Sequence, residues 1–171
     1  MKPKRPARAK SGTAAALARA LKFERDGKRL FTSAAKRSAD PFARQVFELL
    51  AQMEEKHCQD ILAIAKTLEE KGTFPKVSNA PIDARMKMFR KEYNRIRKEK
   101  VISGAAADVM RRALAFEATG REMYDRMSKA AVHPQEKKFF RLLSGEENSH
   151  FTIIYEYLDF LENQGLRMQD G

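Results

Sequence analysis

The sequence predicts an all-α protein: a four-helix bundle made of two repeated antiparallel helix hairpins, joined by a long crossover connection that contains an extra helix. The composition agrees, since 33% of the 171 residues are charged and the chain holds only eight glycines and six prolines, a balance typical of helical domains. The stretch ALKFERDGKRLF (20–31) is matched by ALAFEATGREMY (113–124). In both halves, apolar side chains recur at steps of three and four residues, which is the period of a helix face.

The repeat continues without a gap at an offset of 93 residues, which indicates two copies of one ancestral unit. The copies share helix-breaking residues as well as polar and apolar positions, so we expect the two halves to fold alike. The matched pairs include Pro41 with Pro134, Phe47 with Phe140, Glu54 with Glu147, His57 with His150, and Gly72 with Gly165.

Residues 13–72 form the first predicted hairpin. Its first helix runs to the Asp40-Pro41 step, where proline suits the start of the next helix because its missing N–H would have no partner there. The second helix ends near Gly72, a residue type that readily adopts the left-handed conformation of a helix end. Residues 1–12 precede the hairpin as a basic tail that we expect to be disordered.

Residues 73–102 connect the two hairpins. After a loop around Pro75 and Pro81, residues 82–99 have the pattern of a basic helix. This helix and the basic tail carry most of the net charge of +11. We favour a solvated tail and a solvated helix face over contact with nucleic acid, because no recognition-module signature accompanies the charge.

The second hairpin covers residues 103–167. Ser103 is expected to cap its first helix, the His133-Pro134 step makes its turn, and its last helix ends near Gly165. Residues 13–167 therefore form a single domain, long enough to bury a sizeable core.

The sequence also predicts the compartment and the oligomeric state. No segment approaches the ~18 apolar residues that a membrane span needs, and no apolar segment follows the basic N-terminus as it would in a secretory signal. Cys58 is the single cysteine, so no disulfide can form within the chain. These features predict a cytoplasmic protein. Met86, Met88 and Phe89 would pack the connection against the bundle or a second subunit, and we expect a homodimer.

Six polar side chains fall on the apolar stripes of the four main helices: Glu24, Glu54, His57, Glu117, Glu147 and His150. Each Glu-x-x-His pair has i, i+3 spacing, so both of its side chains lie on one helix face. The single glutamate of each hairpin lies opposite the pair, about 15 residues or ~22 Å from the turn at 1.5 Å per residue. All six side chains are therefore expected to meet in the middle of the bundle.

This set of residues predicts a di-metal site. Four carboxylates in an apolar core repel one another and are costly to desolvate. Two divalent cations would offset the four charges, and imidazole is a common metal ligand. The mixed oxygen and nitrogen set suits iron or manganese, with zinc as a competitor. One glutamate from each of two helices with a Glu-x-x-His from each of the other two is the ligand pattern of ferritin-like di-iron and di-manganese proteins.

The stretches FERDGKRLF with MEEKH, and FEATGREMY with GEENSH, resemble the rubrerythrin-like branch of the ferritin-like superfamily. The resemblance covers about residues 15–72 and 105–165. It implies an oxidoreductase that acts in the response to oxidative stress. Such an enzyme would have a non-haem di-iron centre that reacts with hydrogen peroxide or dioxygen. It also implies a role for each ligand: Glu54 and Glu147 would bridge the metals, Glu24 and Glu117 would be terminal ligands, and His57 and His150 would each bind one metal.

Two features depart from that family, and a third matches it in one half of the repeat only. Full rubrerythrins carry a rubredoxin domain, which is not found here, so we expect a separate electron donor. Gly120 stands where many rubrerythrins have an additional glutamate, which makes the ligand set more symmetric. Tyr124 matches a tyrosine often found near the metals, while its counterpart in the first half is Phe31. Tyr124 would either donate a hydrogen bond behind the ligands or pack in the core.

Other functions remain compatible with the same residues. Iron oxidation and storage would need a large hollow oligomer, a hydroxylase would need an apolar channel to the metals, and a nucleic-acid-binding protein would use the metals only as a structural staple. The remaining polar candidates are expected to lie outside the site: Glu55 and Glu146 as surface charges, His133 as a solvated turn residue, and Cys58 as a packed thiol.

Overall fold

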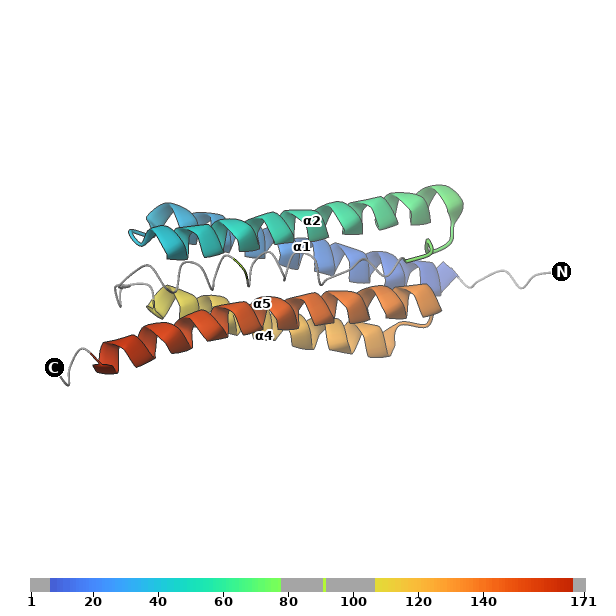
Figure 1. Ribbon diagram of the computed structural model, residues 1–171. Helices are drawn as coiled ribbons and strands as arrows, with labels where there is room; N and C mark the ends of the chain where they lie inside the picture. The colour runs from blue at the N-terminus through green and yellow to red at the C-terminus, as the bar shows by residue number, and fades with distance from the viewer. Residues whose placement is uncertain (1–6, 78–90, 92–106, 168–171) are drawn as a thin grey trace.

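The computed structural model describes residues 7–77, 91 and 107–167. In that part of the chain the long elements are four α-helices (Figure 1): α1 (Ala7–Arg37), α2 (Pro41–Lys71), α4 (Ala107–Ala130) and α5 (Pro134–Arg167). The prediction of an all-α protein with four main helices is confirmed. The crossover with its extra helix, predicted at 73–102, and the cap at Ser103 lie almost wholly outside the described residues.

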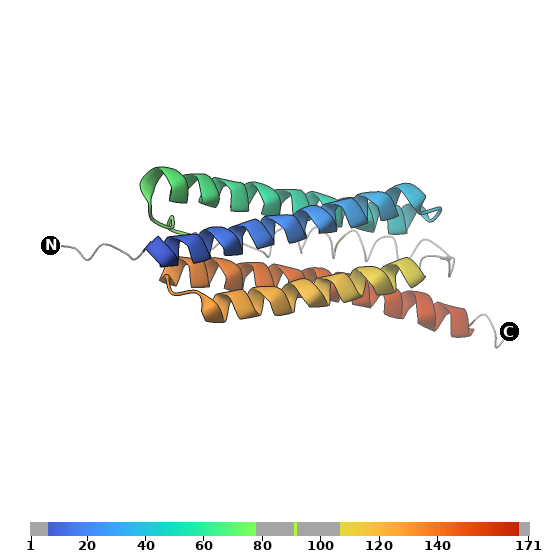
Figure 2. The same ribbon diagram turned by 180° about the vertical axis from the view of Figure 1, so that it is seen from behind.

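The helices form two antiparallel hairpins, α1 with α2 and α4 with α5, which lie side by side along the bundle (Figure 1). The two hairpin turns lie at opposite ends of the bundle, and the view from behind in Figure 2 shows the same arrangement. Helices α1 and α4 contact each other across the two hairpins. The internal repeat is therefore arranged as two like halves turned end for end. None of the described helices is long and apolar enough to cross a membrane.

The ends of α2 are fixed by residues that the sequence marks. Asp40 caps the helix in an extended conformation, with φ −77° and ψ 119°, and its Oδ1 accepts hydrogen bonds from the N–H groups of Phe42 (2.8 Å) and Ala43 (3.0 Å). These bonds satisfy backbone donors that have no partner within the helix. At the other end, Gly72 has φ 65° and its N–H donates to the carbonyl of Leu68 at 2.9 Å. Only a residue without Cβ adopts this φ at little cost.

Helix α1 extends further than the sequence predicts. It begins at Ala7, inside the segment 1–12 that was expected to be a tail, because alanine, lysine and arginine are strong helix formers. Helix α5 ends at Arg167, close to the predicted end near Gly165, since one glycine inside a helix costs only about 1 kcal/mol relative to alanine. The two halves therefore differ at their ends, although both second helices begin at the predicted proline.

The apolar core consists of two clusters with a polar layer between them. One cluster lies towards the α1–α2 turn and includes Phe31, Phe47, Leu50, Met110, Ile154 and Tyr157, and the other lies towards the α4–α5 turn and includes Leu17, Ala20, Ile61, Tyr124, Phe140 and Leu143. Every main helix contributes to this packing, which holds the four helices in register. The polar layer between the clusters contains the candidate site.

Replacement of Asp40 by alanine should destabilise the protein by about 1 kcal/mol, because two backbone N–H groups of α2 lose their acceptor. For a chain of this size, the melting temperature should fall by about 2–4 °C. Thermal unfolding followed by circular dichroism measures the change. The matched control is Asp159→Ala, on the exposed face of α5, and an equal loss in both variants would contradict the capping role of Asp40.

Candidate metal centre

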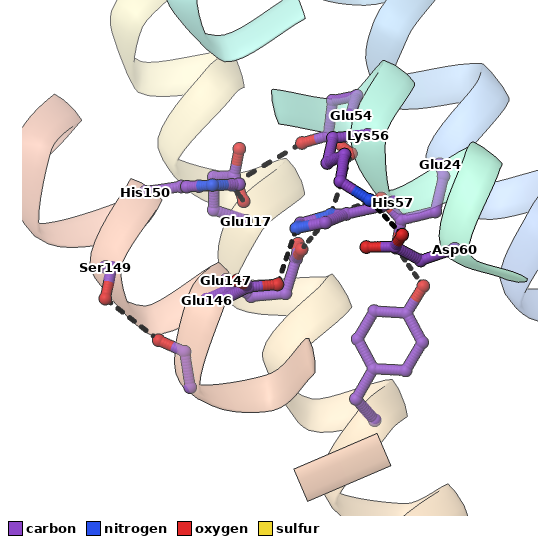
Figure 3. Close-up of polar contacts among 12 residues, drawn as sticks. Glu24, Glu54, Lys56, His57, Asp60, Glu117, Glu146, Glu147, Ser149 and His150 are labelled. Carbon is purple, nitrogen blue, oxygen red and sulfur yellow. Dashed lines mark hydrogen bonds and ion pairs between the residues drawn. The ribbon is translucent and has the colours of Figure 1, made fainter. Parts of the chain in front are cut away.

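The six predicted ligands lie together in the middle of the bundle (Figure 3). They come from all four helices: Glu24 from α1, Glu54 and His57 from α2, Glu117 from α4, and Glu147 and His150 from α5. Each side chain is buried, with a relative exposure of at most 2%. The structure thus brings together every residue that helix periodicity placed at this level.

The six side chains form two overlapping groups whose ligand atoms lie within 4.8 Å of one another. Glu54 and Glu147 belong to both groups, while each of the other four residues belongs to one. We call them the first group (Glu24, Glu54, His57 and Glu147) and the second group (Glu54, Glu117, Glu147 and His150). Two groups that share two carboxylates could hold a pair of neighbouring metal ions.

Both imidazoles direct Nδ1 at the carboxylates. His57 Nδ1 lies 2.9 Å from Glu24 Oε2 and 3.7 Å from Glu147 Oε1. His150 Nδ1 lies 3.4 Å from Glu117 Oε2 and 3.5 Å from Glu54 Oε1. The two rings are nearly parallel, with centroids 5.5 Å apart. Each imidazole therefore belongs to one group, as the repeat predicts.

Two glycines and two phenylalanines make room for the shared carboxylates. A Cβ at Gly120 would overlap the Glu147 carboxylate and would come within 2.6 Å of the Phe23 ring, and a Cβ at Gly27 would lie 2.8 Å from the Phe116 ring and 3.2 Å from Glu54 Cδ. The rings of Phe23 and Phe116 stack between α1 and α4, with centroids 4.3 Å apart. The sequence pattern did not predict this role of the two glycines. The one sign of it in the sequence is that glycine stands at the same position in both repeats, as Gly27 and Gly120.

Burial makes the charged form unfavourable at three of the four carboxyl groups, those of Glu24, Glu117 and Glu147. It raises the pKa of Glu24 from 4.5 to about 7, although the nearby His57 charge opposes this. Burial also raises the pKa of Glu117, together with the charge of Glu54, and the pKa of Glu147, together with the charge of Glu117. Burial first, and repulsion among the carboxylates second, thus favour the protonated forms of these three groups in the metal-free protein.

His57 shows the opposite balance. Burial alone would lower its pKa, but the Glu24 carboxylate and a hydrogen bond with Glu146 raise it well above the ordinary range. The buried layer therefore attracts positive charge, whether carried by protons or by metal ions.

The hydrogen bonding of the site is incomplete. All the side-chain oxygens and nitrogens of Glu54, Glu117, Glu147 and His150 are buried without a hydrogen-bond partner in the part of the chain that the structure describes. An unsatisfied buried polar atom typically costs about 1–3 kcal/mol, and more when charged. Two divalent cations would accept these lone pairs and balance the four carboxylate charges. The residues therefore fit a pair of metal ions, and carboxylate with imidazole suits iron, manganese or zinc.

Glu146 is not the surface charge that the sequence predicted. Its Oε2 lies 2.8 Å from His57 Nε2, and its side chain is only 23% exposed. The prediction was wrong because it considered the stripe of α5 alone, whereas the long Glu146 side chain reaches an imidazole on α2. Glu55, in contrast, lies at the surface with its side chain 41% exposed and pairs with Lys28 at 2.5 Å.

The remaining candidates occupy the predicted surroundings. The hydroxyl of Tyr124, a fully buried residue, donates a hydrogen bond to Glu24 Oε1. Cys58 is buried beside the site, and burial raises the pKa of its thiol to about 11. His133 stays at the α4–α5 turn, where its Nδ1 accepts a hydrogen bond from the N–H of Gln135 at 3.1 Å. Neither Cys58 nor His133 belongs to the two ligand groups.

Comparisons of the chain with protein-family models, curated proteins and solved structures find no match. The rubrerythrin-like resemblance therefore stays a prediction from the motifs. The basis for a function is the ligand set itself and its arrangement in the core.

Replacement of Gly120 by alanine should disturb the site, because the new methyl group would occupy the space of the Glu147 carboxylate and the Phe23 ring. We expect a loss of about 1–3 kcal/mol, as for an overpacked core, and weaker metal binding. Thermal unfolding and metal analysis measure the two effects. Gly12→Ala is the matched control: apart from its own turn of helix, no atom of the described residues lies within 4 Å of a Cβ there, and the change should stabilise α1 by up to about 1 kcal/mol. Unaltered metal content and stability in the Gly120 variant would contradict the close packing.

The metal-free protein should become more stable as the pH falls from 7.5 to 5.5. The pKa values of Glu24, Glu117 and Glu147 are higher in the folded than in the unfolded chain. Their contribution is therefore fully present below about 4.5 and is lost as the pH rises through about 7, the folded pKa of Glu24. Chelator-treated protein should melt about 5 °C higher at pH 5.5 than at pH 7.5. Glu117→Gln should weaken this dependence, and a melting temperature that rises with pH would contradict it.

Proposed function

We propose that the protein is a non-haem di-iron oxidoreductase that reduces hydrogen peroxide or dioxygen with electrons from a separate donor. The observation that carries this proposal is the buried layer of four carboxylates and two imidazoles, most of whose polar atoms have no partner among the described residues. Such a layer is unfavourable without cations and suited to a pair of them. The motif resemblance to rubrerythrins supports iron and the two oxidants.

The first group would hold one iron ion and the second group the other, with Glu54 and Glu147 shared between them. Two iron ions bound there supply two electrons, which is the number that reduces hydrogen peroxide to two water molecules with the uptake of two protons. The mixed set of carboxylates and imidazoles would suit iron.

The residues of this chain have three tasks in such a reaction. The four carboxylates would balance the charge of two divalent cations, because a carboxyl group gives up its proton when it binds a metal ion. The Tyr124 hydroxyl donates a hydrogen bond to Glu24 Oε1 and so orients this carboxylate at the edge of the first group. The apolar clusters on both sides exclude bulk water from the layer, which strengthens the electrostatic interactions within it.

Replacement of Glu147 by alanine should lower the iron content from two ions per chain to one or fewer, because both groups lose a shared ligand. Circular dichroism should show a largely unchanged helix content. The matched control is Glu122→Ala, an exposed glutamate of α4, which should still bind two ions. Unchanged iron content in the Glu147 variant would contradict the site.

The wild-type protein loaded anaerobically with ferrous iron should oxidise two ions per molecule of hydrogen peroxide. Rapid mixing with peroxide, and separately with dissolved dioxygen, measures the two rates. A ferrous protein that reacts with neither oxidant overturns the proposed activity. Particle size in solution separates the storage function, since a monomer or dimer cannot enclose an iron core.

A further inference from the structure

The two halves of the site match in their ligands but not in the residues behind them. The repeat pairs Tyr124 with Phe31 and Glu146 with Met53. In each pair, one member forms a strong hydrogen bond and the other does not. Both of the hydrogen-bonding members contact terminal ligands of the first group.

One oxygen of Glu24 is held by a neighbour outside the ligand set. The Tyr124 hydroxyl donates to Oε1, and Oε2 faces the first group, 2.9 Å from His57 Nδ1. Tyr124 is itself fixed, since it is fully buried and its ring packs against Phe140 (centroids 6.1 Å apart). The Glu24 carboxylate therefore has one preferred orientation in the core.

His57 is held from the opposite side of its ring. Glu146 reaches across from α5 and places Oε2 at 2.8 Å from Nε2 (Figure 3). A carboxylate at this nitrogen keeps the proton on Nε2 and leaves the Nδ1 lone pair for the site. Glu146 thus selects the ring orientation and the tautomer that a metal ion at the first group needs.

The terminal ligands of the second group have no equivalent support. The side-chain atoms of Glu117 and His150 are buried without a hydrogen-bond partner among residues 12–77, 91 and 107–163. The repeat counterparts explain the difference. Phe31 has no hydroxyl to offer, and the Met53 thioether is a weak acceptor.

We propose that the two metal positions are unequal, so that an ion binds first and more tightly at the first group, and that Tyr124 and Glu146 are the positioning residues responsible. The inference rests on the proposed di-metal function and deepens it. Removal of one such outer hydrogen-bond partner typically lowers metal affinity about 10–100-fold. The first ion fills the position whose ligands are already oriented, and the second ion must order Glu117 and His150 as it binds.

Titration of the metal-free protein with Co²⁺ tests the inequality, because the visible absorption of Co²⁺ reports its ligands. The wild-type protein should bind two ions in two resolved steps whose affinities differ at least tenfold. Glu146→Met and Tyr124→Phe, which copy the other half of the repeat, should each weaken the first step about 10–100-fold. Binding of Co²⁺ at the second group should keep its affinity. Unchanged binding there would show that each variant is folded. The double variant should no longer bind an ion preferentially at the first group.

A spectroscopic signal separates positioning from packing. In the wild-type protein with one Co²⁺ ion, proton NMR should show a paramagnetically shifted, exchangeable ring N–H from His57. Glu146→Gln keeps an acceptor at the same place and should retain that signal and most of the affinity, whereas Glu146→Met should lose both.

The outcomes distinguish this inference from the proposed function. If the wild-type protein does not bind two ions, the proposed function itself is overturned. Two ions bound with equal affinity overturn only the inequality. Equal effects of Glu146→Met or Tyr124→Phe on both steps, or no effect on either, overturn the positioning roles.

Discussion

The burial of four carboxylates and two imidazoles in one layer of the core is the constraint on which the rest of the structure depends. Such a layer is stable only if cations, protons or hydrogen bonds neutralise it. The described residues supply hydrogen bonds to Glu24 and His57 but leave Glu54, Glu117, Glu147 and His150 without partners. The apolar clusters on both sides close the layer off from solvent. In a bundle built in this way, the unpartnered carboxylates and imidazoles at the centre favour the binding of cations there.

The internal repeat provides this layer economically. One hairpin contributes a glutamate and a Glu-x-x-His pair, and the second hairpin, turned end for end, contributes the same set from the opposite side. Close approach of the hairpins requires small residues at the contact. Gly27 and Gly120 meet this need, while Phe23 and Phe116 stack between α1 and α4. The shared carboxylates thus occupy space that the glycines leave free.

The positions at which the two halves differ concern the support of the ligands rather than the ligands themselves. Where the halves agree, they define the ligands, and where they differ, at Tyr124 and Glu146, they define how firmly those ligands are held. A duplicated site begins with two equal positions. Changes outside the ligand set can then make the positions unequal while both keep their ligands, because orientation and tautomer depend on the neighbours of a ligand.

The sequence alone determined the helices, their pairing and the six inward-facing polar residues. Helix periodicity and the repeat offset can be read from the order of residues along the chain. It also marked Asp40, Pro41 and Gly72, whose backbone preferences act locally. Only the tertiary structure decided what happens between helices: that Glu146 of α5 bonds to His57 of α2, and that Gly120 accommodates the Glu147 carboxylate. Those contacts depend on how closely and at what rotation the four helices pack, and no pattern within one helix contains that distance.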